Sequence, residues 1–96
     1  MSLEQIAKSI KGIVFDVDGV LTNGQIIYND AGVESKNFHV RDGASIKLLA
    51  SKGIEIAIIT GRASSMVSRR AEELGIVHVV QGAESKIDAL KFLVEN

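Results

Sequence analysis

IVFDVDGVLT, residues 13–22, is the stretch that decides the fold. An apolar strand, residues 12–16, ends there abruptly in two carboxylates, Asp16 and Asp18, followed by a glycine. Burying unpaired carboxylates beside a strand end costs several kcal/mol, which a bound cation or ligand can offset. Ligands of open α/β sheets bind at the carboxyl ends of the strands. Asp16 and Asp18 therefore predict a site for metal-assisted phosphate chemistry.

Length and composition predict one globular domain over residues 1–96, with 46% hydrophobic and 24% charged residues. A net charge of −1 offers no electrostatic basis for a nucleic-acid partner or an acidic membrane surface. Cysteine is absent, which excludes disulfides and thiolate metal sites. The sequence contains no apolar run of membrane-spanning length, and its first residues do not read as a signal peptide. We expect a cytoplasmic protein with neither a nucleic-acid nor a membrane partner.

Hydrophobic periodicity and turn signals predict strands that alternate with helices. We expect a short helix over residues 3–10, buried strands over 12–16 and 54–59, and a third strand over 76–80. A β-hairpin is expected over about 24–39, and further helices over about 43–52, 64–74 and from 86 to the end of the sequence. Asp42 is the expected cap of the second helix, and Phe92, with Ile87, Leu90 and Val94, is expected on the core face of the last helix. This order predicts a doubly wound, parallel, Rossmann-like α/β sheet with a projecting hairpin.

Three strand ends deliver polar residues to one edge of this expected sheet. The first carries Asp16 and Asp18, the second carries Thr60-Gly61-Arg62, and Lys86 follows the third. Mg²⁺ prefers carboxylate and phosphate oxygens, a threonine hydroxyl can hold phosphate, and a lysine neutralises charge during phosphoryl transfer. We therefore expect residues 16, 18, 60 and 86 to surround one anion.

These motifs resemble those of the haloacid dehalogenase-like phosphatases. The first three motifs of that family are matched in order by DVDGVLT at 16–22, by the strand ending in Thr60, and by Lys86 at the start of a helix. The resemblance narrows to the capless branch that dephosphorylates 3-deoxy-D-manno-octulosonate 8-phosphate, through DGVLTNG at 18–24, NFHVRDG at 37–43 and IITGR at 58–62. Similar motifs also occur in phosphatases of sialic-acid-type 9-phosphates and in domains fused to sugar-nucleotide synthetases.

The resemblance implies a role for each matching residue. Asp16 would attack phosphorus to form an aspartyl-phosphate, and Asp18 would protonate the leaving sugar oxygen. The Asp16 carboxylate and the Asp18 carbonyl would ligate Mg²⁺, while Thr60 and Lys86 would hold the phosphoryl group. The implied contacts to a phosphorylated sugar acid are Asp18, His39, Val40, Arg41, Asp42, Gly43, Lys47, Gly61, Arg62, Arg70 and Lys86.

One departure concerns the fourth motif, a Gly-Asp-Asp-x-x-Asp run that supplies a further acidic Mg²⁺ ligand. The sequence contains no such run, and the C-terminal strands of the family are missing. The chain thus resembles the N-terminal part of such an enzyme, and we expect little or no activity from it alone. The resemblance also implies a homotetramer that assembles through the hairpin.

Two other functions fit part of the pattern. A receiver-type phosphoacceptor module also uses aspartate, Mg²⁺, threonine and lysine on a parallel sheet, but its carboxylates lie on different strands. A non-catalytic fragment that only self-assembles fits the absent fourth motif. At single positions, Asp42 can be a helix cap, His39 a packing or hydrogen-bonding residue of the hairpin, and Arg70 a solvent-facing charge.

Overall fold

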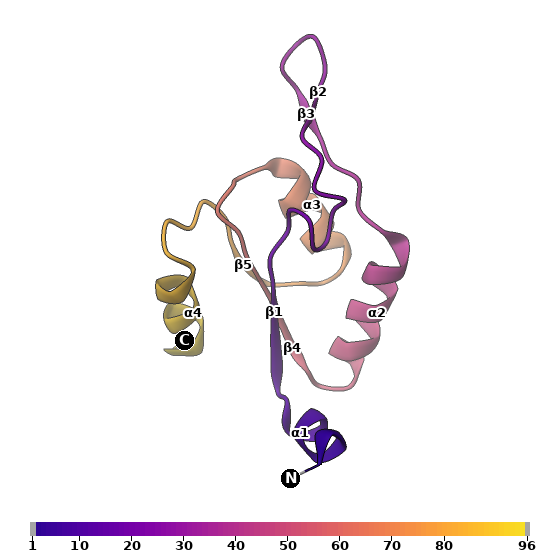
Figure 1. The fold of residues 1–96 in the computed structure, drawn as a ribbon, viewed down its shortest axis with the longest axis vertical. Coiled ribbons are helices and arrows are strands. Elements are labelled where there is room, and N and C mark those ends of the chain that lie inside the picture. The colour runs from indigo at the N-terminus through magenta and orange to yellow at the C-terminus, as the bar shows by residue number, and fades with distance from the viewer. Residues whose placement is uncertain (1, 96) are drawn as a thin grey trace.

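The computed structural model describes residues 2–95, apart from the side chains of Glu4 and Ala7. Strands and helices alternate as the sequence predicted (Figure 1). In chain order the elements are α1 (Leu3–Ser9), β1 (Gly12–Phe15), β2 (Ile27–Tyr28), β3 (Glu34–Ser35), α2 (Val40–Ser51), β4 (Glu55–Ile59), α3 (Ser65–Glu73), β5 (His78–Val80) and α4 (Lys86–Glu95).

The main sheet has three parallel strands in the order β1-β4-β5. Ile13 pairs with Ile56 and Ile58 with Val79, so β4 is the central strand. Both α2 and α4 contact β4, and they lie on opposite sides of the sheet in Figure 1. The expected α/β fold with a parallel sheet is confirmed.

The core lies on the face of the sheet that α2 and α3 cover. Buried apolar side chains come from the loop after β1, from β4, from both helices and from the segment before β5: Val17, Leu21, Ile46, Ile56, Ile58, Val67, Ala71 and Ile76. Ile13 and Phe15 of β1 pack against this cluster. The residue between them, Val14, faces away from it because side chains alternate along a strand.

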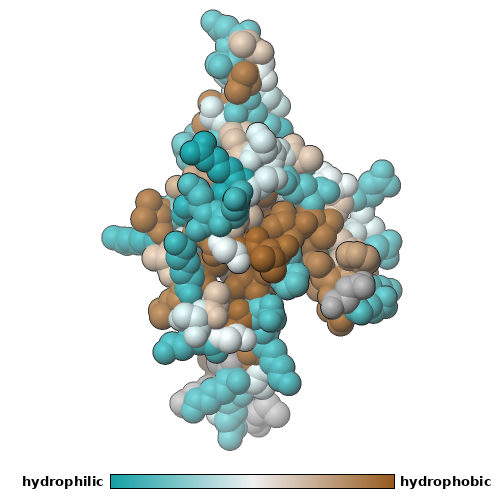
Figure 2. All heavy atoms as spheres, turned by 180° about the vertical axis from the view of Figure 1, so that it is seen from behind, coloured by the Kyte–Doolittle hydropathy of each residue, from teal (hydrophilic) through white to brown (hydrophobic). Residues whose placement is uncertain are grey.

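Two burial predictions are wrong, and both concern the opposite face. The first strand is not buried on both faces, because β1 is an edge strand and Val14 is 44% exposed. None of the ten described residues of α4 is fully buried, and Phe92, expected in the core, is 61% exposed. The half-buried face of α4 carries Ala89 and Leu93 rather than the expected set that includes Ile87, Leu90 and Val94. Apolar surface is accordingly visible on and beside α4 in Figure 2.

The projecting hairpin is confirmed as a separate two-stranded antiparallel sheet of β2 and β3. Its paired strands are shorter than expected, with Ile27 opposite Ser35 and Tyr28 opposite Glu34. The Asn29 side chain accepts the N–H groups of Ala31 and Val33, both at 2.9 Å, which closes the turn. The hairpin extends well beyond the rest of the molecule in Figure 1.

The start of α2 differs from the prediction. The helix begins at Val40, three residues early, and His39 is its N-cap: Nδ1 accepts the N–H of Arg41 at 3.1 Å. Asp42 therefore lies in the first turn, where its carboxylate interacts favourably with the helix dipole, but it is not the cap of the helix. The N-cap of α3 is Ser64, whose hydroxyl accepts the Val67 N–H at 3.2 Å. Within residues 2–95, we find no helix with the length and hydropathy needed to cross a membrane.

Candidate functional site

A tight loop after β1 carries the two carboxylates. Val17 is 1% exposed, and its carbonyl accepts the N–H groups of residues 20, 21 and 22 at 2.9–3.1 Å. The Thr22 hydroxyl oxygen accepts the N–H groups of Gly19 and Gly24, both at 3.2 Å. Gly19 has a φ of 80°, a conformation that glycine adopts readily. The buried valine thus anchors the loop and holds Asp16 and Asp18 at the end of the strand.

Asp16 is paired with Lys86 at this edge of the sheet. The Lys86 ammonium at the start of α4 donates to Asp16 Oδ2 at 2.8 Å, and the Val17 N–H donates to Oδ1 at 2.7 Å. The hydrogen bond from Lys86, against the opposing effect of burial and with help from Val17, holds the pKa of Asp16 below its ordinary value. Asp16 is therefore a carboxylate at neutral pH, the form that attacks phosphorus or binds a cation.

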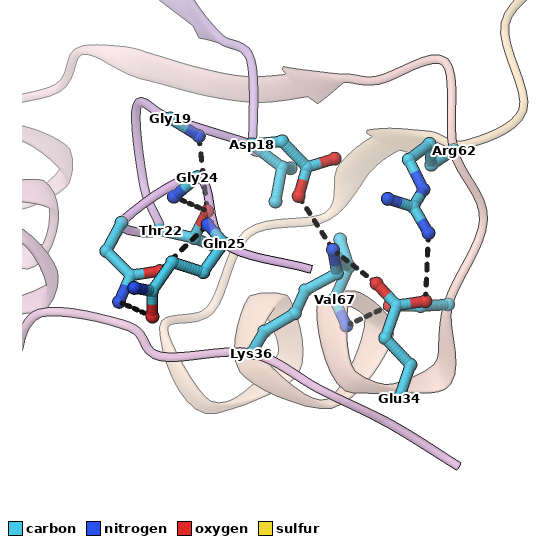
Figure 3. A network of polar contacts seen from close by, with 12 residues as sticks. Asp18, Gly19, Thr22, Gly24, Gln25, Glu34, Lys36, Arg62 and Val67 are labelled. Carbon is cyan, nitrogen blue, oxygen red and sulfur yellow. Dashed lines mark hydrogen bonds and ion pairs between the residues drawn. The ribbon is translucent and has the colours of Figure 1, made fainter. Parts of the chain in front are cut away.

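Asp18 is held by a residue that sequence reasoning missed. The Lys36 ammonium, on the segment after β3, donates to Asp18 Oδ1 at 2.7 Å (Figure 3). The Lys36 side chain is only 2% exposed and also forms an ion pair with Glu34 Oε1 at 3.0 Å. Burial lowers the pKa of Lys36, but the Asp18 and Glu34 carboxylates outweigh it and raise that pKa above its ordinary value. Lys36 is therefore a buried ammonium ion.

Glu34, also missed, extends these contacts to Arg62. Its second oxygen, Oε2, accepts from the Arg62 guanidinium at 3.1 Å, and Arg62 also donates to the Tyr28 hydroxyl at 3.3 Å. The hydrogen bond with Tyr28, followed by the charge of Glu34, raises the pKa of Arg62. Glu34 and Lys36 stand two residues apart, so they share one face of the hairpin. This two-residue spacing is the one sequence signal for a shared role of Glu34 and Lys36. It becomes informative only once the structure shows that this face of the hairpin meets the strand ends.

Thr60 directly follows β4 and is buried. Its N–H donates to the Val80 carbonyl at 2.9 Å, and its carbonyl accepts the Ala83 N–H at 3.0 Å. One hollow is lined by Asp18, Thr60 and Arg62 together with Glu34 and Lys36. Asp16 and Lys86 line a neighbouring hollow instead. The structure thus brings the four predicted residues to the strand ends as two pairs, Asp16 with Lys86 and Asp18 with Thr60.

The residues predicted to contact substrate fall into two further groups. His39, Asp42, Gly43 and Arg70 line one apolar cavity beside Phe38, with the Arg70 guanidinium 6.0 Å from the centre of the Phe38 ring. Arg70 is half-buried, so it is not simply a solvent-facing charge. A side chain at Gly43 would collide with this guanidinium. Exposed residues form the second group: Val40, Arg41, Lys47 and Gly61.

The metal donors fit Mg²⁺ in kind. Asp16 and Asp18 offer the hard oxygens that Mg²⁺ prefers, and such sites often use one or two protein carboxylates with water and phosphate. Their present partners are lysine ammonium groups, which a cation would have to displace or share. Among the described residues, no group of three or more acidic or histidine side chains could hold a metal ion. The chain therefore provides a two-carboxylate set.

Comparison with known proteins identifies the family. The sequence model of the haloacid dehalogenase-like hydrolase family matches residues 13–94. The 3-deoxy-D-manno-octulosonate 8-phosphate phosphatase of Salmonella typhi is 45% identical over 89 residues, which are 93% of this chain and 47% of that protein.

Solved structures give the same picture. The phosphatase of that name from Moraxella catarrhalis, in complex with a magnesium ion, a phosphate ion and a KDO molecule, is 54% identical, with a TM-score of 0.91 over 95% of this chain and 52% of its own. The Yersinia pestis phosphatase is 42% identical, with a TM-score of 0.92 over 95% of this chain and 49% of its own. This chain spans about half the length of the relatives it matches.

Proposed function

Because this chain belongs to the haloacid dehalogenase-like hydrolase family, we propose that it carries the phosphoryl-transfer residues of a Mg²⁺-dependent phosphomonoesterase. The observation that supports this most is the pair formed by Asp16 and Lys86 at the carboxyl end of β1, with Asp18 two residues further on. A carboxylate kept charged by a lysine suits nucleophilic attack, and a second carboxyl group suits proton transfer.

The proposed reaction has two steps. In the first, an Asp16 oxygen bonds to phosphorus while the bond to the sugar oxygen breaks, and Asp18 gives that oxygen a proton. In the second, water bonds to the phosphorus of the aspartyl-phosphate, Asp18 takes the water proton, and inorganic phosphate leaves with Asp16 restored. Lys86 and Thr60 hold the phosphoryl oxygens. Mg²⁺, held by the Asp16 carboxylate and the Asp18 carbonyl, would supply positive charge for the phosphoryl group.

The proposed substrate is a phosphorylated sugar acid, with 3-deoxy-D-manno-octulosonate 8-phosphate as the leading candidate. The support is the name shared by relatives at 42–54% identity, together with the cations at the site. Arg62 is 41% exposed at the rim of the Asp18 hollow, and its guanidinium can bind a carboxylate or phosphate in bidentate fashion. His39 to Gly43, Lys47 and Arg70 are proposed as further contacts.

We expect little or no turnover from this chain alone, because the Asp16 carboxylate and the Asp18 carbonyl hold Mg²⁺ weakly without a further acidic ligand. The test is phosphate release from p-nitrophenyl phosphate and from the sugar phosphate, with and without Mg²⁺. Asp16→Asn should abolish release, and Asp30→Asn, an exposed carboxylate of the hairpin turn, should not change it. Release that survives Asp16→Asn would overturn the proposed function. A rate of phosphate release equal to that of the longer relatives would overturn the expectation of little turnover by this chain.

The lifetime of the phosphoryl group on Asp16 distinguishes a receiver-type signalling module from a phosphatase. A phosphatase hydrolyses its aspartyl-phosphate quickly, whereas a signalling module keeps it for hours. Labelling with acetyl phosphate, followed by intact mass measurement over time, therefore distinguishes the two. A stable adduct of one phosphoryl group on Asp16 would favour the signalling module.

A further inference from the structure

We propose that Lys36 is a positioning residue for Asp18, so that the hairpin forms part of the reaction site. The inference rests on the proposed function, in which Asp18 exchanges a proton with the sugar oxygen and with water. It adds residues that lie outside the three sequence motifs. Lys36 and Glu34 belong to the hairpin, whereas Asp18 and Arg62 follow β1 and β4.

The contacts form one continuous chain from Asp18 to Arg62. Lys36 lies 2.7 Å from Asp18 and 3.0 Å from Glu34, and Glu34 lies 3.1 Å from Arg62. In Figure 3, Asp18 and Arg62 lie at the two ends of this chain, with Lys36 and Glu34 between them. Since Glu34 uses a different oxygen for each cation, one carboxylate sets the places of both.

Burial makes this arrangement more than a surface ion pair. Exposed pairs contribute little, because solvent screens them and both side chains remain mobile. The Lys36 side chain is almost fully buried and Glu34 is largely buried, so neither can relax into water. A buried charge without a partner is strongly unfavourable, and Lys36 must therefore keep its contacts with the two carboxylates. Its ammonium is a fixed point for Asp18.

The contact leaves Asp18 able to act. Lys36 binds Oδ1, so the second oxygen, Oδ2, is the one that can carry the exchanged proton. Asp18 itself is 31% exposed and lines the hollow with Thr60, so it remains within reach of a bound phosphate ester. Proton transfer requires the donor within hydrogen-bond reach of the leaving oxygen. By fixing one oxygen, Lys36 determines where the other points.

The direct test measures the Asp18 rotamer by NMR, from scalar couplings to its carboxyl carbon in the full chain. We expect one staggered rotamer in the parent protein and averaging between rotamers in Lys36→Met. Lys91→Met, which removes an exposed lysine of α4, is the matched control and should keep one rotamer. A single unchanged rotamer in Lys36→Met would overturn the proposal. If that variant fails to fold, Lys36→Met with Glu34→Gln removes the buried pair together and is read in the same way.

The kinetic test compares two leaving groups. An alkyl phosphate needs a proton on its leaving oxygen, whereas p-nitrophenolate leaves without one. We expect Lys36→Met to lower kcat for the alkyl phosphate by about tenfold or more, and to change kcat for p-nitrophenyl phosphate far less. Equal losses for both substrates would indicate a merely structural role and overturn the proposal. Should Asp16→Asn leave turnover intact, the proposed function fails, and the rotamer measurement still decides the role of Lys36.

Discussion

Val17 shows how one apolar residue between two carboxylates supports the chemistry of both. Its side chain is packed in the core beside Leu21 and Ile46, while its carbonyl closes the loop. The carboxylates on either side remain partly exposed at the strand end. A buried anchor therefore keeps two polar groups at the surface in a defined place.

We predict that Val17→Ala lowers the free energy of unfolding by about 2 kcal/mol, because it leaves a cavity in a close-packed core. Urea denaturation followed by circular dichroism measures this change. Val20→Ala, at an exposed position of the same loop, should change the free energy by less than about 0.5 kcal/mol. Equal effects at the two positions would contradict the role of Val17 as the anchor.

The Asp16–Lys86 contact predicts a change in acid titration. Lys86→Met removes the main cause of the lowered pKa of Asp16, so this pKa should rise toward its ordinary value of 3.8. Because the pKa in the folded protein lies below that value, the contact stabilises the fold above pH 3.8, and the contribution is lost as the pH falls through the folded pKa. An NMR titration of the Asp16 carboxyl carbon in metal-free buffer measures the shift. Lys91→Met should leave it in place, and an unmoved pKa in Lys86→Met would show that the contact is absent in solution.

At the scale of the elements, caps and short loops place the site more than helix packing does. The α3 helix starts at Ser65, shortly after the Thr60-Gly61-Arg62 segment. The N–H of its cap residue Ser64 donates to the Gln81 side chain at 2.7 Å. Gln81 in turn donates to Ser68 at 2.7 Å. The segment after β5 is thus tied to the start of α3. This contact helps to hold the ends of β4 and β5 together.

We predict that Ser64→Ala lowers the free energy of unfolding by about 1 kcal/mol, since the first turn of α3 loses its hydroxyl acceptor. Ser65→Ala, one residue later and exposed, is the matched control and should change it by less than about 0.5 kcal/mol. Thermal or urea denaturation of the three proteins provides the comparison. If Ser65→Ala lowered the free energy of unfolding as much as Ser64→Ala, Ser64 would not be the cap.

At the scale of the whole molecule, exposed apolar side chains among the described residues include groups on the hairpin and between β1 and α4. The hairpin exposes Ile26, Tyr28 and Val33, and a hollow between β1 and α4 exposes Val14, Ile87 and Leu90. Contiguous exposed apolar surface commonly marks an interface between chains. We propose that the hairpin region mediates a homotetramer.

Light scattering coupled to size-exclusion chromatography tests this assembly. The parent chain should elute with the mass of a tetramer, and Ile26→Ser with Val33→Ser should shift it toward smaller species. Val77→Ser, an exposed apolar residue between α3 and β5, should not change the mass. A monomeric parent chain would contradict assembly through the hairpin.

The sequence by itself determined the order of strands and helices, the hairpin, the placement of Asp16, Asp18 and Thr60 at strand ends, and that of Lys86 at the start of the last helix. These features follow from local patterns: apolar runs, glycines that end elements, and polar residues that follow a strand directly. The cap of α2 escaped this reasoning, because His39 and Asp42 are both able to accept N–H groups and the choice depends on where the chain leaves the hairpin.

Only the tertiary structure decided which charges meet. Lys36 is 18 residues from Asp18, and Lys86 is 70 residues from Asp16, so no local pattern specifies either contact. The chain that returns from the hairpin must pass beside the strand ends before Lys36 and Glu34 reach Asp18 and Arg62. Burial of β1 and α4 was likewise decided by tertiary packing, because the face of the sheet away from the core is only partly covered and leaves Val14 44% exposed. Long-range packing, rather than residue type, sets both the partners of a charge and the exposure of an apolar side chain.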